Sequence, residues 1–134
     1  MILLLISVSA SAQDKIDGYW LTQDGNSIVE IYKDDAGDYS GKIVWLKNPT
    51  DSKGNPHTDK MNNDRSLRNR PMMGLNILEN LKYDDEWKGT IYAAKRGRKL
   101  NASLSLKSDD ELTVEVSYMR FSRQQIWTKT ELPK

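Results

Sequence analysis

The sequence predicts a small all-β protein, an antiparallel up-and-down β-barrel with one long mid-chain loop. Apolar and polar residues alternate with a period of two over several segments, turn-forming clusters separate these segments, and helical periodicity is scarce. Seven or eight short strands joined by tight turns are typical of a closed barrel or a sandwich. A strand pair that flanks the long loop, with chain ends expected to be neighbours, favours the barrel.

The alternation is clearest in the last third of the chain. Apolar residues occupy every second position of 100–106 and again of 112–118, with polar residues between them. Further strands are expected over 87–94 and 123–129. Strands with one apolar and one polar face predict an antiparallel meander that packs one face on a core.

Three more strands are expected near the start of the domain, over residues 18–22, 27–33 and 39–47. Their β-branched and aromatic residues favour extended backbone. The third has apolar residues on both faces, which predicts a central strand covered on both sides. Residues 72–81 are apolar as well, and both a strand and a short helix are compatible with them.

Between residues 48 and 71 the pattern is interrupted. This stretch is polar, contains three of the four prolines, and is too long for an ordinary connection. Functional residues are disproportionately found on loops that a rigid scaffold positions. We therefore expect this loop to be the segment most relevant to function.

The first twelve residues differ from the rest of the chain. An apolar run over 1–6 is followed by small residues, and Ala10 and Ala12 fit the A-x-A pattern that signal peptidase requires. The run is far shorter than the ~20 apolar residues of a membrane span. We expect a signal peptide over 1–12, cleaved after Ala12, and a single β-barrel domain over 13–134. The alternative is a buried N-terminal strand.

Composition excludes several classes of function. The 20 Lys and Arg residues balance 19 Asp and Glu residues, so no overall field attracts nucleic acid or an anionic membrane. The chain has no cysteine and one histidine, which argues against thiol chemistry and a zinc site. We expect no metal, no cofactor, no nucleic-acid partner and no membrane span, in a soluble protein of the periplasm or the exterior.

Several motifs resemble those of a known family. The most specific lies in the long loop, and the full set is residues 18–22, 28–32, 41–46, 59–62, 67–75, 87–92 and 123–129. With these motifs, nearly the whole mature chain resembles the DUF2147 family of uncharacterised bacterial exported proteins. The resemblance implies a lipocalin-like (calycin) barrel, an envelope or secreted location, and no established activity.

Two turns depart from the family's pattern. The turn after Tyr92 usually resembles Asp-Pro-x-x-Gly, whereas residues 93–97 read AAKRG here. The segment before the last strand usually contains more glycine, whereas residues 119–122 read MRFS. Any role that the family gives these two hairpins is therefore not carried over.

The two ends of the domain also resemble the barrel-closing device of calycins, in which a first-strand tryptophan packs under a last-strand cation. The resemblance implies that Gly18 and Trp20 belong to this closure, together with Trp127 of the last strand. Arg123 is the candidate cation, through stacking and hydrogen bonds to the opposite end of the chain. This role is structural.

The long loop contains most of the candidate binding residues. Arg65, Arg68 and Arg70 could recognise an anionic ligand, since guanidinium groups match carboxylate or phosphate. They could instead lock the loop by pairing with its own acids, and this interpretation is preferred. Asp59 and Asn62 offer oxygen ligands for Ca²⁺, but the spacing is not that of a known calcium loop, which favours local turn capping.

Aromatic residues could line a cavity, with Trp45 and Tyr92 as candidates beside an arginine. Small barrels more often fill their interior with side chains, which would redirect attention to surfaces and protein partners. The basic segment 95–99 could contact anionic lipid or polymer, but so few charges bind weakly, and a solvated turn is expected.

Two functions of different classes follow. The first is a binding module of the bacterial envelope, capped by loop 48–71, whose arginines face a small molecule or an envelope protein. The second is a hydrolase at the barrel mouth, which would need His57 with nearby serine and aspartate residues. Because no nucleophile-elbow motif surrounds His57, no catalytic residue is assigned and binding is favoured over enzymatic activity.

Overall fold

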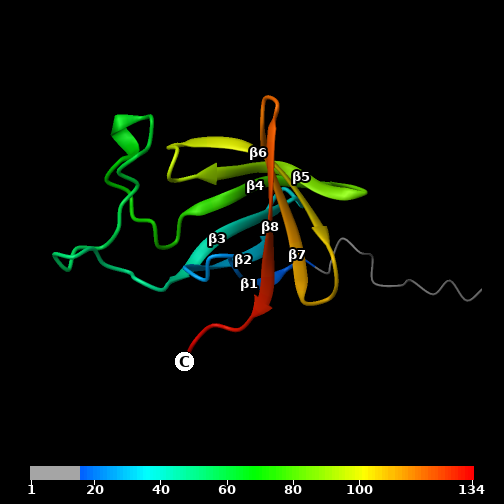
Figure 1. Cartoon of the computed structure of the whole chain (residues 1–134), viewed down its shortest axis with the longest axis horizontal. Helices are drawn as coiled ribbons and strands as arrows, with labels where there is room; N and C mark the ends of the chain where they lie inside the picture. Colours follow the sequence, from blue (N-terminus) through cyan, green and yellow to red (C-terminus); the bar gives the residue numbers. More distant parts are fainter. Residues whose placement is uncertain (1–15) are drawn as a thin grey trace, which may run out of the picture.

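Eight antiparallel strands close into a barrel in a computed structural model that describes residues 16–134 (Figure 1). Each strand is hydrogen-bonded to its neighbours in sequence, and the first strand pairs with the last. The predicted small antiparallel up-and-down barrel is therefore confirmed. The strands are β1 (Gly18–Leu21), β2 (Ser27–Lys33), β3 (Tyr39–Leu46), β4 (Asn76–Asp84), β5 (Glu86–Ala93), β6 (Arg98–Leu106), β7 (Glu111–Tyr118) and β8 (Phe121–Thr130).

Two local expectations change. Residues 72–75 form a turn, in which the Leu75 amide donates to the Met72 carbonyl oxygen at 3.1 Å, and strand β4 begins only after it. The expectation that β3 is covered on both faces is wrong, because Val44, Trp45 and Leu46 are only half-buried. A register irregularity at Ile28/Val29, where β2 pairs with β3, accompanies this partly exposed end of the strand.

Side chains fill much of the barrel interior. The inward positions of β6 and β7 are buried from Leu100 to Leu104 and at Leu112 and Val114, as the period-two alternation predicts. Aromatic and aliphatic residues from the other strands complete this packing. The members with at most 1% exposure are Ile16, Trp20, Val29, Ile31, Leu78, Leu81, Leu104, Leu112, Val114 and Trp127.

One end of this core is closed by Trp20. Its indole Nε1–H donates to the Ile16 carbonyl oxygen at 2.8 Å, and both residues are fully buried. The ammonium group of Lys129, the β8 residue paired with Trp20, lies 5.4 Å from the centroid of the Trp20 ring. Gly18 lies against the Lys129 side chain with a φ of +126°, which L-residues rarely adopt.

The closing cation is therefore Lys129, and the assignment of this role to Arg123 is wrong. Arg123 pairs with Val116 of β7, six residues away from Lys129 along β8. Trp127, which the resemblance assigns to the closure, is buried in the core, and its indole donates to the Gln125 side-chain oxygen at 3.1 Å. Which cation reaches Trp20 is decided by the register of β8 against β1.

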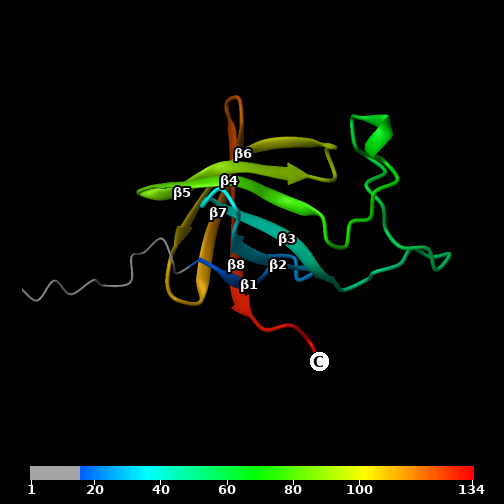
Figure 2. The same ribbon diagram turned by 180° about the vertical axis from the view of Figure 1, so that it is seen from behind.

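The up-and-down order places four connections at the opposite end of the barrel, which we call the mouth. They are the β1–β2, β5–β6 and β7–β8 turns and the long β3–β4 loop. The loop contains a short 3₁₀ turn, η2 (Arg65–Leu67). Figures 1 and 2 show the loop beside the β5–β6 turn from both sides of the molecule.

We predict that Trp20→Phe lowers the free energy of unfolding by about 1–3 kcal/mol, because the buried Ile16 carbonyl loses its donor. Trp45→Phe is the control, since Trp45 is half-buried and makes no side-chain hydrogen bond within residues 16–134. Urea denaturation followed by far-ultraviolet circular dichroism measures both. Equal losses in the two variants would contradict this role for Trp20.

Candidate functional site

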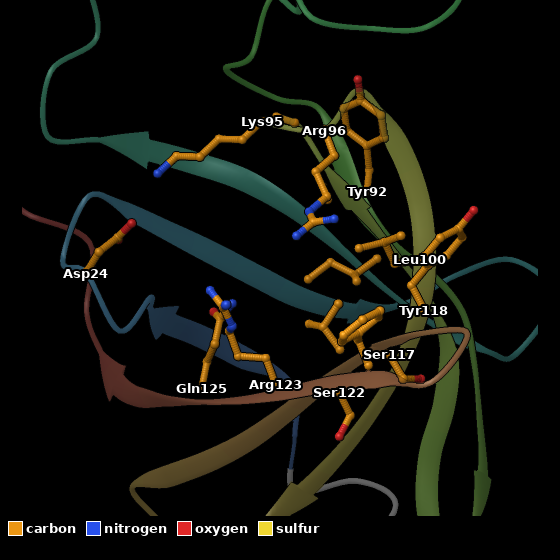
Figure 3. A pocket seen from close by; sticks show the side chains of 15 residues that line it. Asp24, Tyr92, Lys95, Arg96, Leu100, Ser117, Tyr118, Ser122, Arg123 and Gln125 are labelled. Atoms are coloured by element: carbon orange, nitrogen blue, oxygen red, sulfur yellow. The ribbon is translucent and has the colours of Figure 1, made fainter.

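A cavity of about 730 Å³ opens at the mouth of the barrel (Figure 3). Its walls come from the β5–β6 hairpin, the β7–β8 hairpin and the β1–β2 turn. The lining residues are Asp24, Ile91, Tyr92, Ala93, Ala94, Lys95, Arg96, Leu100, Val116, Ser117, Tyr118, Phe121, Ser122, Arg123 and Gln125.

The inner wall of the cavity is apolar. Ile91 and Leu100 are cross-strand partners on β5 and β6 and are nearly buried, and Val116 of β7 lies half-buried beside them in the lining. Tyr118 and Phe121 add aromatic rings near the β7–β8 turn, where Phe121 is 79% exposed. A ligand with an apolar body would gain by covering these side chains.

The rim is mostly cationic. Lys95 and Arg96 come from the β5–β6 turn and Arg123 comes from β8, whereas Asp24 is the one acidic residue in the lining. Figure 3 shows Arg96 and Arg123 pointing into the same space from different sides of the cavity, with Gln125 next to Arg123. The Lys95 side chain extends instead toward Asp24.

Asp24 is held ionised by its surroundings. Burial is the largest single influence and raises the pKa of its carboxyl group. Hydrogen bonds from the Asn26 amide and the Thr22 hydroxyl group, with the positive charge of Lys95, outweigh burial and lower the pKa. One negative charge thus offsets Lys95, and the charges of Arg96 and Arg123 are left uncompensated.

The candidates predicted in the long loop lie elsewhere. Asp59 is 1% exposed, and three side chains donate to its carboxylate. The Tyr92 hydroxyl donates to Oδ1 at 2.6 Å, while Asn62 Nδ2 and Arg70 Nε donate to Oδ2 at 2.7 and 2.8 Å. The Arg70 guanidinium also lies 5.1 Å from the centroid of the Tyr92 ring.

These contacts set the ionisation of both partners. Burial favours the neutral form of Asp59, but the hydrogen bonds from Asn62, Tyr92 and Arg70, with the charge of Arg70, outweigh it and lower the Asp59 pKa below its ordinary 3.8. Burial, followed by the hydrogen bond to Asp59, raises the pKa of Tyr92. Asp59 is therefore an anion that accepts, and Tyr92 a neutral phenol that donates.

Further contacts attach the loop to the β5–β6 turn. Arg68 Nε donates to the Asn62 carbonyl oxygen at 2.7 Å, and the Asn63 amide donates to the Gly97 carbonyl oxygen at 3.0 Å. Gly97 has a φ of +68°, and a Cβ atom there would overlap the Met61 carbonyl oxygen. Only glycine lets the loop approach this closely.

The sequence predicts that loop 48–71 caps the barrel with its arginines facing a small molecule or an envelope protein. No residue of this loop lines the cavity, so the small-molecule form of this expectation is wrong. Arg68 and Arg70 hold the loop together, and Arg65 is exposed with no side-chain partner within residues 16–134. The locking interpretation describes Arg68 and Arg70 correctly, because the loop's own groups satisfy them.

Trp45 and Tyr92 do not both line the cavity, although the sequence makes both of them candidates for its lining. Trp45 does not line the cavity, whereas Tyr92 does, although its hydroxyl group is already bound to Asp59. Figure 3 shows this hydroxyl directed away from the cavity. The arginines that line the cavity are Arg96 and Arg123. The sequence predicts Arg96 in a solvated turn and Arg123 beside Trp20. The two arginines come together only when the sheet closes into a barrel, and short-range sequence patterns do not report that.

Within residues 16–134, His57 makes no side-chain hydrogen bond to a serine or a carboxylate. No group of three or more His, Asp or Glu side chains is arranged to hold a metal ion there. Both carboxylate oxygens of Asp59, the central candidate for Ca²⁺, already accept hydrogen bonds.

We predict that Arg70→Ala lowers the free energy of unfolding by about 2 kcal/mol, because the buried Asp59 charge loses its cation. Arg68→Ala, which removes one donor, costs about 1 kcal/mol. Arg65→Ala is the control and changes stability by less than about 0.5 kcal/mol. Thermal and urea denaturation measure all three, and equal effects would contradict the roles given to Arg68 and Arg70.

The Asp59 carboxylate also predicts a pH dependence. Because the folded pKa is lowered, its contribution is complete above the unfolded pKa and is lost as pH falls through the folded value. The stability difference between the parent protein and Asp59→Asn should be constant at neutral pH and shrink below about pH 4. Urea denaturation at a series of pH values tests this, and a difference that does not shrink would contradict the assignment.

Among residues 16–134, no helix is long and apolar enough to cross a membrane. The fold resembles a solved structure described as "Protein HP1028 from the human pathogen Helicobacter pylori belongs to the lipocalin family". The TM-score is 0.71 at 22% identity, over 86% of this chain and 82% of the other. This likeness supports the lipocalin-like architecture of the barrel.

None of the curated proteins compared with the sequence matches it. The family model described as "Uncharacterized protein conserved in bacteria (DUF2147)" matches residues 18–129. That stretch begins with β1, ends within β8 and includes both the mouth cavity and the docked loop. The chain therefore belongs to the DUF2147 family.

Proposed function

We propose that this protein binds a small, largely apolar molecule in the mouth cavity. The observation that carries the proposal is that the packed core stops short of the mouth. There Ile91, Leu100 and Val116 line an open space of about 730 Å³. Ligand sites in proteins are concave, mostly apolar and on the order of 300–1,000 Å³, with a few polar groups that orient the ligand.

The construction of the mouth supports a preformed site. The β5–β6 hairpin is held from outside by the docked loop, through Asp59, Tyr92 and Gly97. On the other wall, Arg98 Nη1 donates to the Tyr118 hydroxyl group at 3.0 Å, and the guanidinium lies 4.8 Å from the centroid of that ring. A cavity whose walls are already fixed loses less conformational entropy on binding.

We further propose that binding takes place outside the cytoplasm. The predicted signal peptide, residues 1–12 with cleavage after Ala12, supports this location and lies outside the described residues. The absence of cysteine is compatible with export, because the barrel is stabilised by its core. The alternative of a hydrolase gains no support, because no Ser–His–Asp hydrogen-bonding arrangement is found in residues 16–134.

We predict that the neutral fluorescent probe N-phenyl-1-naphthylamine binds to the protein and that Val116→Trp weakens binding at least about tenfold, by filling the cavity. Val44→Trp is the matched control, since Val44 is also a half-buried strand valine but lies outside the lining. Fluorescence titration measures both variants after circular dichroism has verified folding. Unchanged binding by folded Val116→Trp would overturn the site.

A further inference from the structure

We propose that the mouth selects amphipathic anions, with Arg96 and Arg123 binding the oxyanion head group and Ile91, Leu100 and Val116 covering an apolar chain. This inference rests on the proposed function, because it assigns a chemical class to the ligand of the same cavity. The head group is a carboxylate or a phosphate, and the body is a single apolar chain.

The first argument is which arginines already have a partner within the protein. Arg68, Arg70 and Arg98 donate to a carbonyl, a carboxylate and a phenol within the protein. Arg96 and Arg123 make no ion pair or side-chain hydrogen bond with residues 16–134. The guanidinium groups of Arg96 and Arg123 thus have hydrogen-bond donors that no other group in residues 16–134 uses.

The second argument is the placement of these donors. Arg96 enters from the β5–β6 turn and Arg123 from β8, so two separate elements bring guanidinium groups to one space (Figure 3). Planar guanidinium groups donate two parallel hydrogen bonds to carboxylate or phosphate oxygens. An oxyanion between them would satisfy donors on both sides and relieve the repulsion of the two like charges.

The third argument is the charge balance of the lining. Lys95, Arg96 and Arg123 are opposed by Asp24 alone, and Asp24 is directed toward Lys95. A cationic head group would therefore be repelled, and a neutral one would leave the arginines without a partner. The apolar lining in turn disfavours small, fully polar anions, which would leave the half-buried Val116 and the exposed Phe121 uncovered.

The experiment compares ligands with the same ten-carbon chain and different head groups. Decanoate, decyl phosphate and decanol are each titrated directly into the protein by isothermal titration calorimetry, below the concentrations at which they aggregate. We expect at least one anion to bind about tenfold or more tightly than decanol, as charge-assisted hydrogen bonds predict. The relative affinities of decanoate and decyl phosphate identify the preferred head group.

The variants Arg96→Gln and Arg123→Gln are expected to lower the affinity for the anion by about five- to tenfold each. The double variant is expected to remove the preference over decanol and to leave decanol binding unchanged. Arg120→Gln is the matched control, because Arg120 is exposed on the β7–β8 turn but does not line the cavity. It removes the same charge near the mouth and should keep the preference.

The outcomes separate this inference from the proposed function. Equal binding of decanol and both anions, or an Arg120→Gln loss equal to that of Arg96→Gln and Arg123→Gln, overturns the head-group assignment and leaves the ligand-binding function standing. Failure of the naphthylamine probe and all three ten-carbon ligands to bind overturns both. Loss of decanol binding in a folded double variant also overturns the assignment, because the arginines would then shape the cavity rather than select charge.

Discussion

Asp59 is a buried anion whose hydrogen-bond donors come from its own loop and from strand β5, so all three donors reach it only while the loop lies against the β5–β6 hairpin. A buried carboxylate has to be paired and hydrogen-bonded, and the Tyr92 hydroxyl group makes docking of the loop part of that pairing. The same hairpin supplies Tyr92, Lys95 and Arg96 to the mouth. The shape of one cavity wall therefore depends on a contact made on the side that faces away from the cavity.

The barrel divides into a filled region and an open region. Trp20 and Lys129 close the filled end. Core side chains pack the interior from there toward the mouth, where Ile91, Leu100 and Val116 line the open cavity. Two hairpins at the mouth, which include residues 93–97 and 119–122, contribute to the cavity lining. The barrel and the docked loop form the scaffold, and these hairpins supply much of the chemistry of the mouth.

Period-two alternation predicted antiparallel strands with one buried face, as residues 100–106 and 112–118 illustrate, and the expected neighbourhood of the chain ends favoured a barrel over a sandwich. The locking role of Arg68 and Arg70 could also be inferred, since acids of the same loop supply local compensation. The residues that line the cavity could not be inferred from the sequence. Arg123 and Lys129 are both cations of β8, and only the register against β1 decides which one reaches Trp20. Likewise, Arg96 enters the cavity because barrel closure brings β5–β6 and β7–β8 together, a long-range outcome that local sequence does not encode.

The outer tip of the long loop is built differently from its docked half. Thr50 pairs with Pro56, and the Gly54 amide donates to the Asp51 carbonyl oxygen at 3.0 Å, so these contacts are internal to the tip, and its side chains are exposed. The docked half begins beyond it, at His57 and Asp59. Lys53, at the tip, is thus an attachment point for a fluorophore or an affinity label, where a bulky group would not disturb the anchoring carboxylate.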